Sequence, residues 1–133
     1  MKNKRSAILL VESKDLSVEE ISDIIGQHPD RFRRKGDTGL PPARPLKVNV
    51  WEVREDVARE EYLGLALERL WPRILPLERG LAELAQRGSF IQLSLVQWIS
   101  EADPHQPGFG LGAQELRFLA GINAQMDVDQ YAP

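Results

Sequence analysis

Leucine and isoleucine recur at alternating steps of four and three residues over 63–84, which is the spacing of a helix with one apolar side. Pro72 and Pro76 lie inside this repeat, and each proline removes a helical hydrogen bond and clashes with the preceding turn. Residues 56–87 are therefore predicted to form two helices, or one strongly kinked helix, with the break near Pro72. The repeat fits a dimeric coiled coil or a helix packed on the chain's own core, and its short, interrupted length favours the core.

Strand patterns lie on both sides of this helical region. Residues 6–13 are an apolar run of the kind found in central strands that are buried on both faces. Residues 46–54 and 90–100 place their side chains alternately on two faces, as strands do. A further helix is predicted within 109–123, and a last strand within 124–133.

The first helix has clear sequence signals at both ends. Ser17 and Glu20 form a capping box, in which each side chain satisfies a free amide at the helix start, and Gly26 suits the left-handed residue after a helix. The following residues 27–45 contain prolines and glycines that predict a loop. Residues 16–26 resemble residues 111–121, so the chain carries two similar segments that each follow one predicted strand and precede another.

This order of elements predicts an α+β fold in a single domain of residues 1–133. Two strand–helix–strand halves with extra helices between them give a ferredoxin-like βαβ–(αα)–βαβ layout. The expected sheet is four-stranded and mainly antiparallel, with a helical insertion. A chain of 133 residues is long enough to bury one such core without disulfides or metals.

Composition excludes several chemistries. The chain has no cysteine and two histidines, which excludes disulfides, zinc–thiolate sites, cysteine nucleophiles and histidine-rich metal sites. Its net charge of -3 argues against a general attraction to nucleic acid. The apolar run at residues 7–11 is too short for a signal peptide or a membrane span. We therefore expect a cytoplasmic protein with no cofactor and no membrane partner.

Short motifs spread along the chain carry a family resemblance. They are GQHPDRFRRKGD at residues 26–37, Trp51 on the second predicted strand, the leucine-rich middle, GFGL before the last helix, and MDVDQYA at the end. On these motifs the chain resembles the bacterial domain of unknown function family 4279, from the first strand to Tyr131. The resemblance implies that family's fold and a bacterial, intracellular setting, and it brings no activity with it. Relatives usually carry a serine at the helix N-cap position where Gly112 stands.

The densest positive charge in the chain lies in the segment PDRFRRKGD. Its candidate binding residues are Arg31, Arg33, Arg34, Lys35 and Asp37. The sequence Lys-Gly-Asp at its end is typical of a turn, because glycine accepts a positive φ and aspartate bonds its own backbone. The structural interpretation is a loop in which Lys35 or an arginine pairs with a carboxylate such as Asp129. The same cations are candidates for contact with a protein partner, or with an anion or nucleic acid, although no nucleic-acid motif accompanies them.

An acidic pair lies near the C-terminus. Asp127, Asp129 and Tyr131 are spaced by two residues, which predicts that they lie on one face of the last strand. Paired carboxylates can hold a hard cation or divide acid and base roles, as a metal-assisted enzyme requires. A solvated face, or pairing with the cationic segment, is the interpretation we favour.

Two other motifs are interpreted as structural. Glu101, Asp103 and His105 lack the glycine and the closing glutamate of a calcium loop, so they predict a turn. The sequence GFGLG lacks the spacing of a phosphate-binding loop, and it predicts a helix N-cap at Gly112.

Trp51 and Trp98 lie on the less apolar faces of their predicted strands. If helices cover only one side of the sheet, the two tryptophans belong to an exposed amphipathic surface of the kind found at interfaces. If the inserted helices cover that side, the tryptophans are core residues. The pattern of polarity leaves both alternatives open.

The sequence favours a non-catalytic binding or protein-interaction module, of a regulatory or immunity type, with a protein partner. We assign no catalytic and no metal-binding residue, do not expect nucleic acid as the main partner, and leave a homodimer open. The alternatives are a metal-assisted enzyme that uses Asp127 and Asp129, and an anion or nucleic-acid site in the Arg31–Lys35 loop. The candidate binding residues are Arg31, Arg33, Arg34, Lys35, Asp37, Trp51, Trp98, Asp127, Asp129 and Tyr131.

Overall fold

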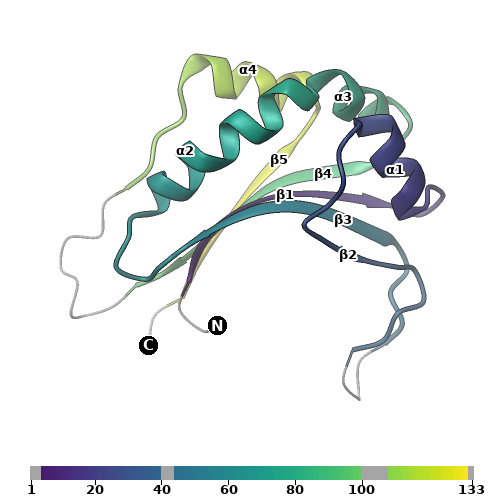
Figure 1. Cartoon of the computed structure of the whole chain (residues 1–133), viewed down its shortest axis with the longest axis horizontal. Helices are drawn as coiled ribbons and strands as arrows, with labels where there is room; N and C mark the ends of the chain where they lie inside the picture. Colours follow the sequence, from purple (N-terminus) through teal and green to yellow (C-terminus); the bar gives the residue numbers. More distant parts are fainter. Residues whose placement is uncertain (1–3, 40–43, 100–107, 132–133) are drawn as a thin grey trace.

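The computed structural model describes residues 4–39, 44–99 and 108–131. It is an α+β structure whose elements are labelled in Figure 1. The strands are β1 (Arg5–Ser13), β2 (Arg31–Arg33), β3 (Asn49–Val57), β4 (Phe90–Trp98) and β5 (Gln125–Tyr131). The helices are α1 (Val18–Ile25), α2 (Leu63–Ile74), the 3₁₀ helix η1 (Leu75–Leu77), α3 (Glu78–Gln86) and α4 (Ala113–Gly121).

The strands form one 5-stranded mixed sheet in the order β2-β3-β1-β4-β5. The central strand β1 is antiparallel to both neighbours, β2 is antiparallel to β3, and β5 is parallel to β4. The α+β class is confirmed, whereas the four-stranded ferredoxin-like sheet is not, because the sheet has a fifth strand and a parallel pair. The predicted loop 27–45 contains β2, whose three exposed residues give no apolar pattern from which a strand could be predicted.

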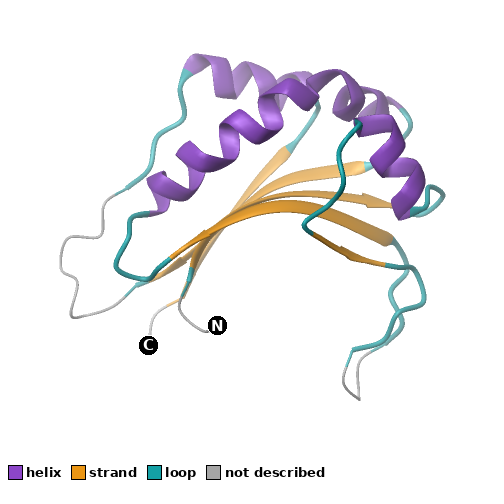
Figure 2. Ribbon diagram, in the orientation of Figure 1, coloured by secondary structure: helices purple, strands orange, loops and turns teal. Residues whose placement is uncertain are grey.

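The helices lie on one face of the sheet, and none of the described helices lies on the other (Figure 2). The described parts of the connection between β2 and β3, residues 34–39 and 44–48, extend away from the helices (Figure 1). No helix within the described ranges combines the length and the apolarity that crossing a membrane requires.

Burial alternates along the central strand, which shows how the two faces differ. Ala7, Leu9 and Val11 point toward the helices and are fully buried. Ile8 and Leu10 point to the other face and are half-buried. The prediction of a central strand is thus confirmed, whereas the predicted burial of both its faces is wrong, because none of the described helices covers the face that carries Ile8 and Leu10.

The predicted ends of the first helix are confirmed. The Ser17 side chain accepts the Glu20 N–H at 3.0 Å, and the Glu20 carboxylate accepts the Ser17 N–H at 3.1 Å. Gly26 follows α1 with a left-handed φ of 78°. At the corresponding position before α4, Gly112 is the N-cap and has no side chain to accept a hydrogen bond.

The leucine repeat packs on the chain's own core, as the favoured interpretation required. Its fully or nearly fully buried members are Leu63, Leu67, Leu70, Ile74, Leu81 and Leu84. The break lies at η1, one turn later than predicted, because Pro76 stands in the first turn of η1 and Pro72 remains inside α2. Pro72 is exposed, as is Glu68 one turn before it, so the missing hydrogen bond lies on the side of α2 that faces solvent.

Candidate functional site: the uncovered face of the sheet

The face of the sheet opposite the helices, here called the uncovered face, gathers polar, aromatic and aliphatic side chains from every strand. Strand register assigns its members. They are Arg31 and Arg33 of β2; Val50, Glu52, Arg54 and Asp56 of β3; Ser6, Ile8, Leu10 and Glu12 of β1; Phe90, Gln92, Ser94, Val96 and Trp98 of β4; and Gln125, Asp127, Asp129 and Tyr131 of β5. Six of the ten candidate binding residues predicted from the sequence lie on this face.

An aromatic pair lies at one end of the uncovered face. Register places Trp98 beside Tyr131, and their rings stack with centroids 4.8 Å apart and an interplanar angle of 26°. Trp98 is half-buried and the Tyr131 side chain is 44% exposed. Stacking fixes two large amphipathic side chains in one orientation, so little side-chain entropy remains to be lost on contact with a partner.

Trp51 lies on the opposite side of the sheet from Trp98. It is 0% exposed, and its indole Nε1 donates a hydrogen bond to Ser22 Oγ at 3.2 Å, which joins β3 to α1. The core alternative therefore holds for Trp51, which cannot contact a partner on the uncovered face. The exposed-surface alternative agrees with the position of Trp98.

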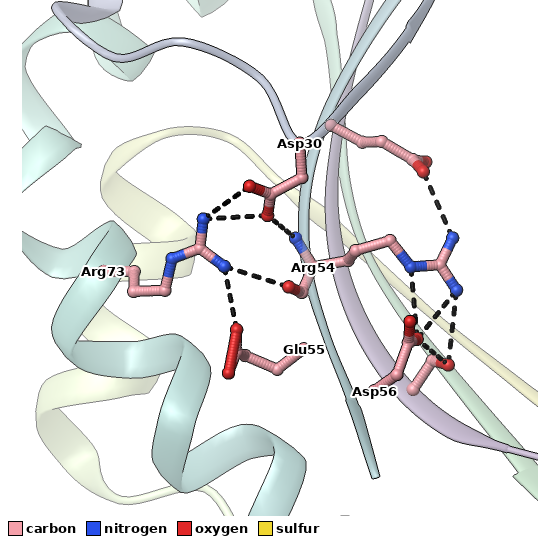
Figure 3. Close-up of polar contacts among 7 residues, drawn as sticks. Asp30, Arg54, Glu55, Asp56 and Arg73 are labelled. Carbon is pink, nitrogen blue, oxygen red and sulfur yellow. Dashed lines mark hydrogen bonds and ion pairs between the residues drawn. The ribbon is translucent and has the colours of Figure 1, made fainter.

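Arg54 occupies the middle of β3 and is held by carboxylates on its own strand. Its guanidinium nitrogens lie 2.9 Å from Asp56 Oδ1 and 3.2 Å from Glu52 Oε1. Figure 3 shows the Arg54 guanidinium and Asp56 at its right side. Burial on its own raises the pKa of Asp56, but hydrogen bonds from Ser6 and Arg54 outweigh it and leave that pKa below its ordinary value. This arginine is thus already committed within the protein.

Arg31 and Arg33 stand at the β2 edge without such partners. Both side chains are exposed, and neither forms an ion pair or a side-chain hydrogen bond with any residue of the described ranges. They line a hollow of about 430 Å³ together with Val50 and Glu52. Arg31 also lines a second hollow of about 180 Å³ that extends to Trp98. The two cations are therefore available at the surface of a concave region.

Arg34, Asp37 and the backbone of Lys35 make contacts within the fold. Arg34 forms a two-point ion pair with Glu19 of α1, with nitrogen–oxygen distances of 2.7 and 3.0 Å, and this hydrogen bonding lowers the pKa of Glu19. The Asp37 carboxylate accepts the Arg34 N–H at 2.7 Å, and Gly36 has a φ of 94°, so the predicted turn is confirmed. The backbone N–H of Lys35 donates to Asn49 Oδ1 at 2.8 Å.

The predicted pairing of this segment with Asp129 is wrong. β2 and β5 are the two opposite edges of the sheet, so Asp129 lies too far from Arg31 and Arg33 to pair with them. Asp127 and Asp129 do lie on one face, as predicted. Partial desolvation, and then the charge and a hydrogen bond of Asp127, raise the pKa of Asp129 above its ordinary value. The β5 edge thus carries two carboxylates that repel each other.

The described ranges contain no cluster of side chains suited to binding a metal ion. No group of three or more histidine, cysteine, aspartate or glutamate side chains comes together there in a way that could hold a metal ion. The acidic pair therefore lacks a third protein ligand among these residues. The predicted turn at Glu101, Asp103 and His105 lies outside the described residues.

Sequence reasoning missed an ionic junction that fixes β2 to the rest of the fold. Arg73 of α2 contacts both Asp30 carboxylate oxygens, at 2.9 and 2.8 Å, and also Glu55 Oε2 at 2.9 Å (Figure 3, left). Asp30 in turn accepts the Arg54 N–H at 2.9 Å, so it continues the edge pairing of β3 beyond β2. Asp30 and Arg73 are separated by 43 residues, and no local pattern links them.

Replacement of Arg73 by alanine is expected to lower the free energy of unfolding by about 2 kcal/mol. The substitution removes charge-assisted hydrogen bonds and leaves Asp30 and Glu55 close together without a cation. Urea denaturation measures the change. Arg69→Ala is the matched control on α2, because Arg69 is exposed, and its loss is expected to change stability by less than about 0.5 kcal/mol. Equal effects of the two substitutions would contradict the role of the junction.

Comparison with known proteins gives a family and no function. A family profile described as "Domain of unknown function (DUF4279)" matches residues 3–133, which is essentially the whole chain. No curated protein and no solved structure shows a significant match. The sequence resemblance to this family is confirmed, and the chain belongs to the DUF4279 family.

Proposed function

We propose that this protein is a non-catalytic protein-binding module and that the uncovered face of its sheet is the binding surface. The observation that carries the proposal is that all the helices in the described part of the chain lie on one face of the sheet, while Ile8, Leu10 and Val96 are half-buried on the other. Apolar side chains arranged over several strands and rimmed by polar ones are typical of interaction sites.

The remaining side chains of this face suit a protein partner. Tryptophan, tyrosine and arginine are the residues that contribute most to binding at protein interfaces, and the face presents Trp98, Tyr131, Arg31 and Arg33. Its hollows beside Arg31 offer space for partner side chains. Specific binding of this kind needs no catalytic group.

A polyanion fits the same face poorly. Nucleic acid would gain from Arg31 and Arg33, but the face also carries Asp127 and Asp129, which would repel its phosphates. A protein surface with charges of both signs avoids this conflict. The two charged edges therefore favour a protein over nucleic acid.

We also propose a ferredoxin-like origin for part of the sheet, and a cytoplasmic setting. Strands β2-β3-β1-β4 are mutually antiparallel neighbours, and helices connect β1 to β2 and β3 to β4, which supports a split βαβ arrangement extended by α4 and β5. The cysteine-free composition supports the setting.

Site-specific photo-crosslinking tests the proposed function. A photoreactive amino acid replaces Gln92 near the middle of the uncovered face, and the matched control carries it at Glu68, which is exposed on α2. Irradiation of cells that produce each variant is expected to give a discrete protein adduct from position 92 and none of the same mass from position 68. No adduct from position 92, or the same adduct from both positions, would contradict the proposal.

A further inference from the structure

We propose that the protein partner is a second copy of this chain, bound face to face through the uncovered face about a two-fold axis. The inference rests on the proposed function of that face and names its partner. Three properties support it: the separation of charge across the face, the apolar residues at its centre, and its area.

Charge is separated across the uncovered face. The cations Arg31 and Arg33 lie on β2 and the anions Asp127 and Asp129 lie on β5, at opposite edges of the sheet. Between these edges lie Arg54, which is ion-paired with Glu52 and Asp56, and also the carboxylate of Glu12 and the ammonium of Lys4. Each edge therefore has an excess of one sign, and the two signs are complementary.

A two-fold axis brings these edges together twice. The axis lies in the plane between the two sheets, perpendicular to the line that joins the charged edges. It places Arg31 and Arg33 of one copy against the acidic pair of the other, and the symmetry repeats the contact at the opposite side. The repulsion within the acidic pair is relieved when a cation of the partner lies beside it.

Apolar side chains lie where the axis would pass. Strand β1 is the middle strand of five. Register aligns Leu10 with Arg31 through Glu52, and aligns Ile8 with Asp127 through Ser94, so the midpoint between the charged pairs falls between Ile8 and Leu10. An apolar centre with a charged rim is the usual anatomy of a specific interface.

The area of the face is sufficient for a stable dimer. Five strands at about 4.8 Å spacing, with a mean length of about seven residues at about 3.3 Å each, give a face of about 550 Å². Two copies would bury about 1,100 Å², which exceeds the roughly 1,000 Å² expected of a biological interface. Further aromatic area comes from Trp98 and Tyr131 at the rim.

Charge reversal tests the proposal by sedimentation of the purified full chain. The unmodified protein is expected to sediment as a dimer. One variant combines Arg31→Glu with Arg33→Glu, and the other combines Asp127→Lys with Asp129→Lys. Each variant alone is expected to self-associate at least about a hundredfold more weakly, because like charges then face each other at both ends of the interface. An equimolar mixture is expected to recover a dimer that contains one copy of each variant, because opposite charges meet again.

The control variant combines Arg69→Glu with Arg79→Glu, two exposed arginines on the helix side, and changes the net charge by the same amount as the first variant. It is expected to remain dimeric. A monomeric unmodified protein overturns the proposal, as do reversed variants that dimerise normally, or a mixture that stays monomeric although both variants are folded by circular dichroism. If the unmodified protein is monomeric but position 92 crosslinks to a different protein, the second copy is excluded and the proposed function stands. If position 92 gives no adduct at all, both fail.

Discussion

Replacement of Trp51 by alanine is expected to lower the free energy of unfolding by about 3–5 kcal/mol. Trp51 is completely buried between the sheet and α1, so the substitution leaves a large cavity in the main core. It also removes the indole N–H from Ser22 Oγ. Urea denaturation followed by circular dichroism measures the loss, and a loss of this size is a large fraction of the stability of an ordinary domain.

Trp98→Ala is the matched control for this substitution. Trp98 is half-buried on the uncovered face, where its ring contacts Tyr131 and where none of the described helices lies. Its loss is expected to cost less than half as much as the loss of Trp51, because much of its surface is already in contact with solvent. If Trp98→Ala were the more destabilising change, the assignment of the two faces would be wrong.

Replacement of Gly80 by alanine is expected to destabilise the protein by about 3 kcal/mol. Gly80 lies in α3 where that helix crosses the end of α1, and an added Cβ would lie 2.5 Å from the Ile24 carbonyl oxygen and 2.8 Å from the Ile25 Cα. Both atoms belong to the backbone, so a side-chain rotation cannot remove the clash. The two helices must separate, which loosens the packing of both against the core. Thermal and urea denaturation measure the effect.

Gly121→Ala provides the control for Gly80. Gly121 is the last residue of α4, and a Cβ there would lie 3.5 Å from Glu78 Oε1, which is an ordinary contact. Alanine is the better helix former, so this variant is expected to be as stable as the unmodified protein or slightly more stable. Similar losses at both glycines would show that α1 and α3 do not approach closely.

Local signals allowed much of the secondary structure to be predicted. The capping box of Ser17 and Glu20, the left-handed Gly26 and the alternating polarity of residues 90–98 depend on neighbours within one turn or one strand. Such signals are complete within a short stretch of sequence. The predictions that failed concern pairings between distant segments, which no short stretch contains.

The face of the second long strand shows this limit. Val50 and Trp51 are adjacent on β3 and both are apolar, so the alternation of polarity alone could not show which of them faces the helices. The choice depends on where α1 and α2 pack, and it places Trp51 in the core and Val50 on the uncovered face. The same reason explains why β2 was missed, since its pairing with β3 comes from tertiary structure and not from its three exposed residues.

The sequence identified individual residues of the candidate site, but it did not identify the surface that they form together. Arg31, Arg33, Trp98, Asp127, Asp129 and Tyr131 were all named from the sequence. Their common face could not be predicted, because it depends on a strand order in which β2 and β5 form opposite edges. That order also turns an expected ion pair within one chain into two separated charges.

The central claim is that a protein partner binds the uncovered face. Hydroxyl-radical footprinting tests it most directly. The chain has two tyrosines of similar exposure: Tyr131, 44% exposed on the uncovered face, and Tyr62, 40% exposed at the start of α2. We expect oxidation of Tyr131 to be several times slower in the cell than in the dilute purified chain. The oxidation rate of Tyr62 is expected to be similar under the two conditions. Equal oxidation of Tyr131 in the cell and in the dilute chain would contradict the claim.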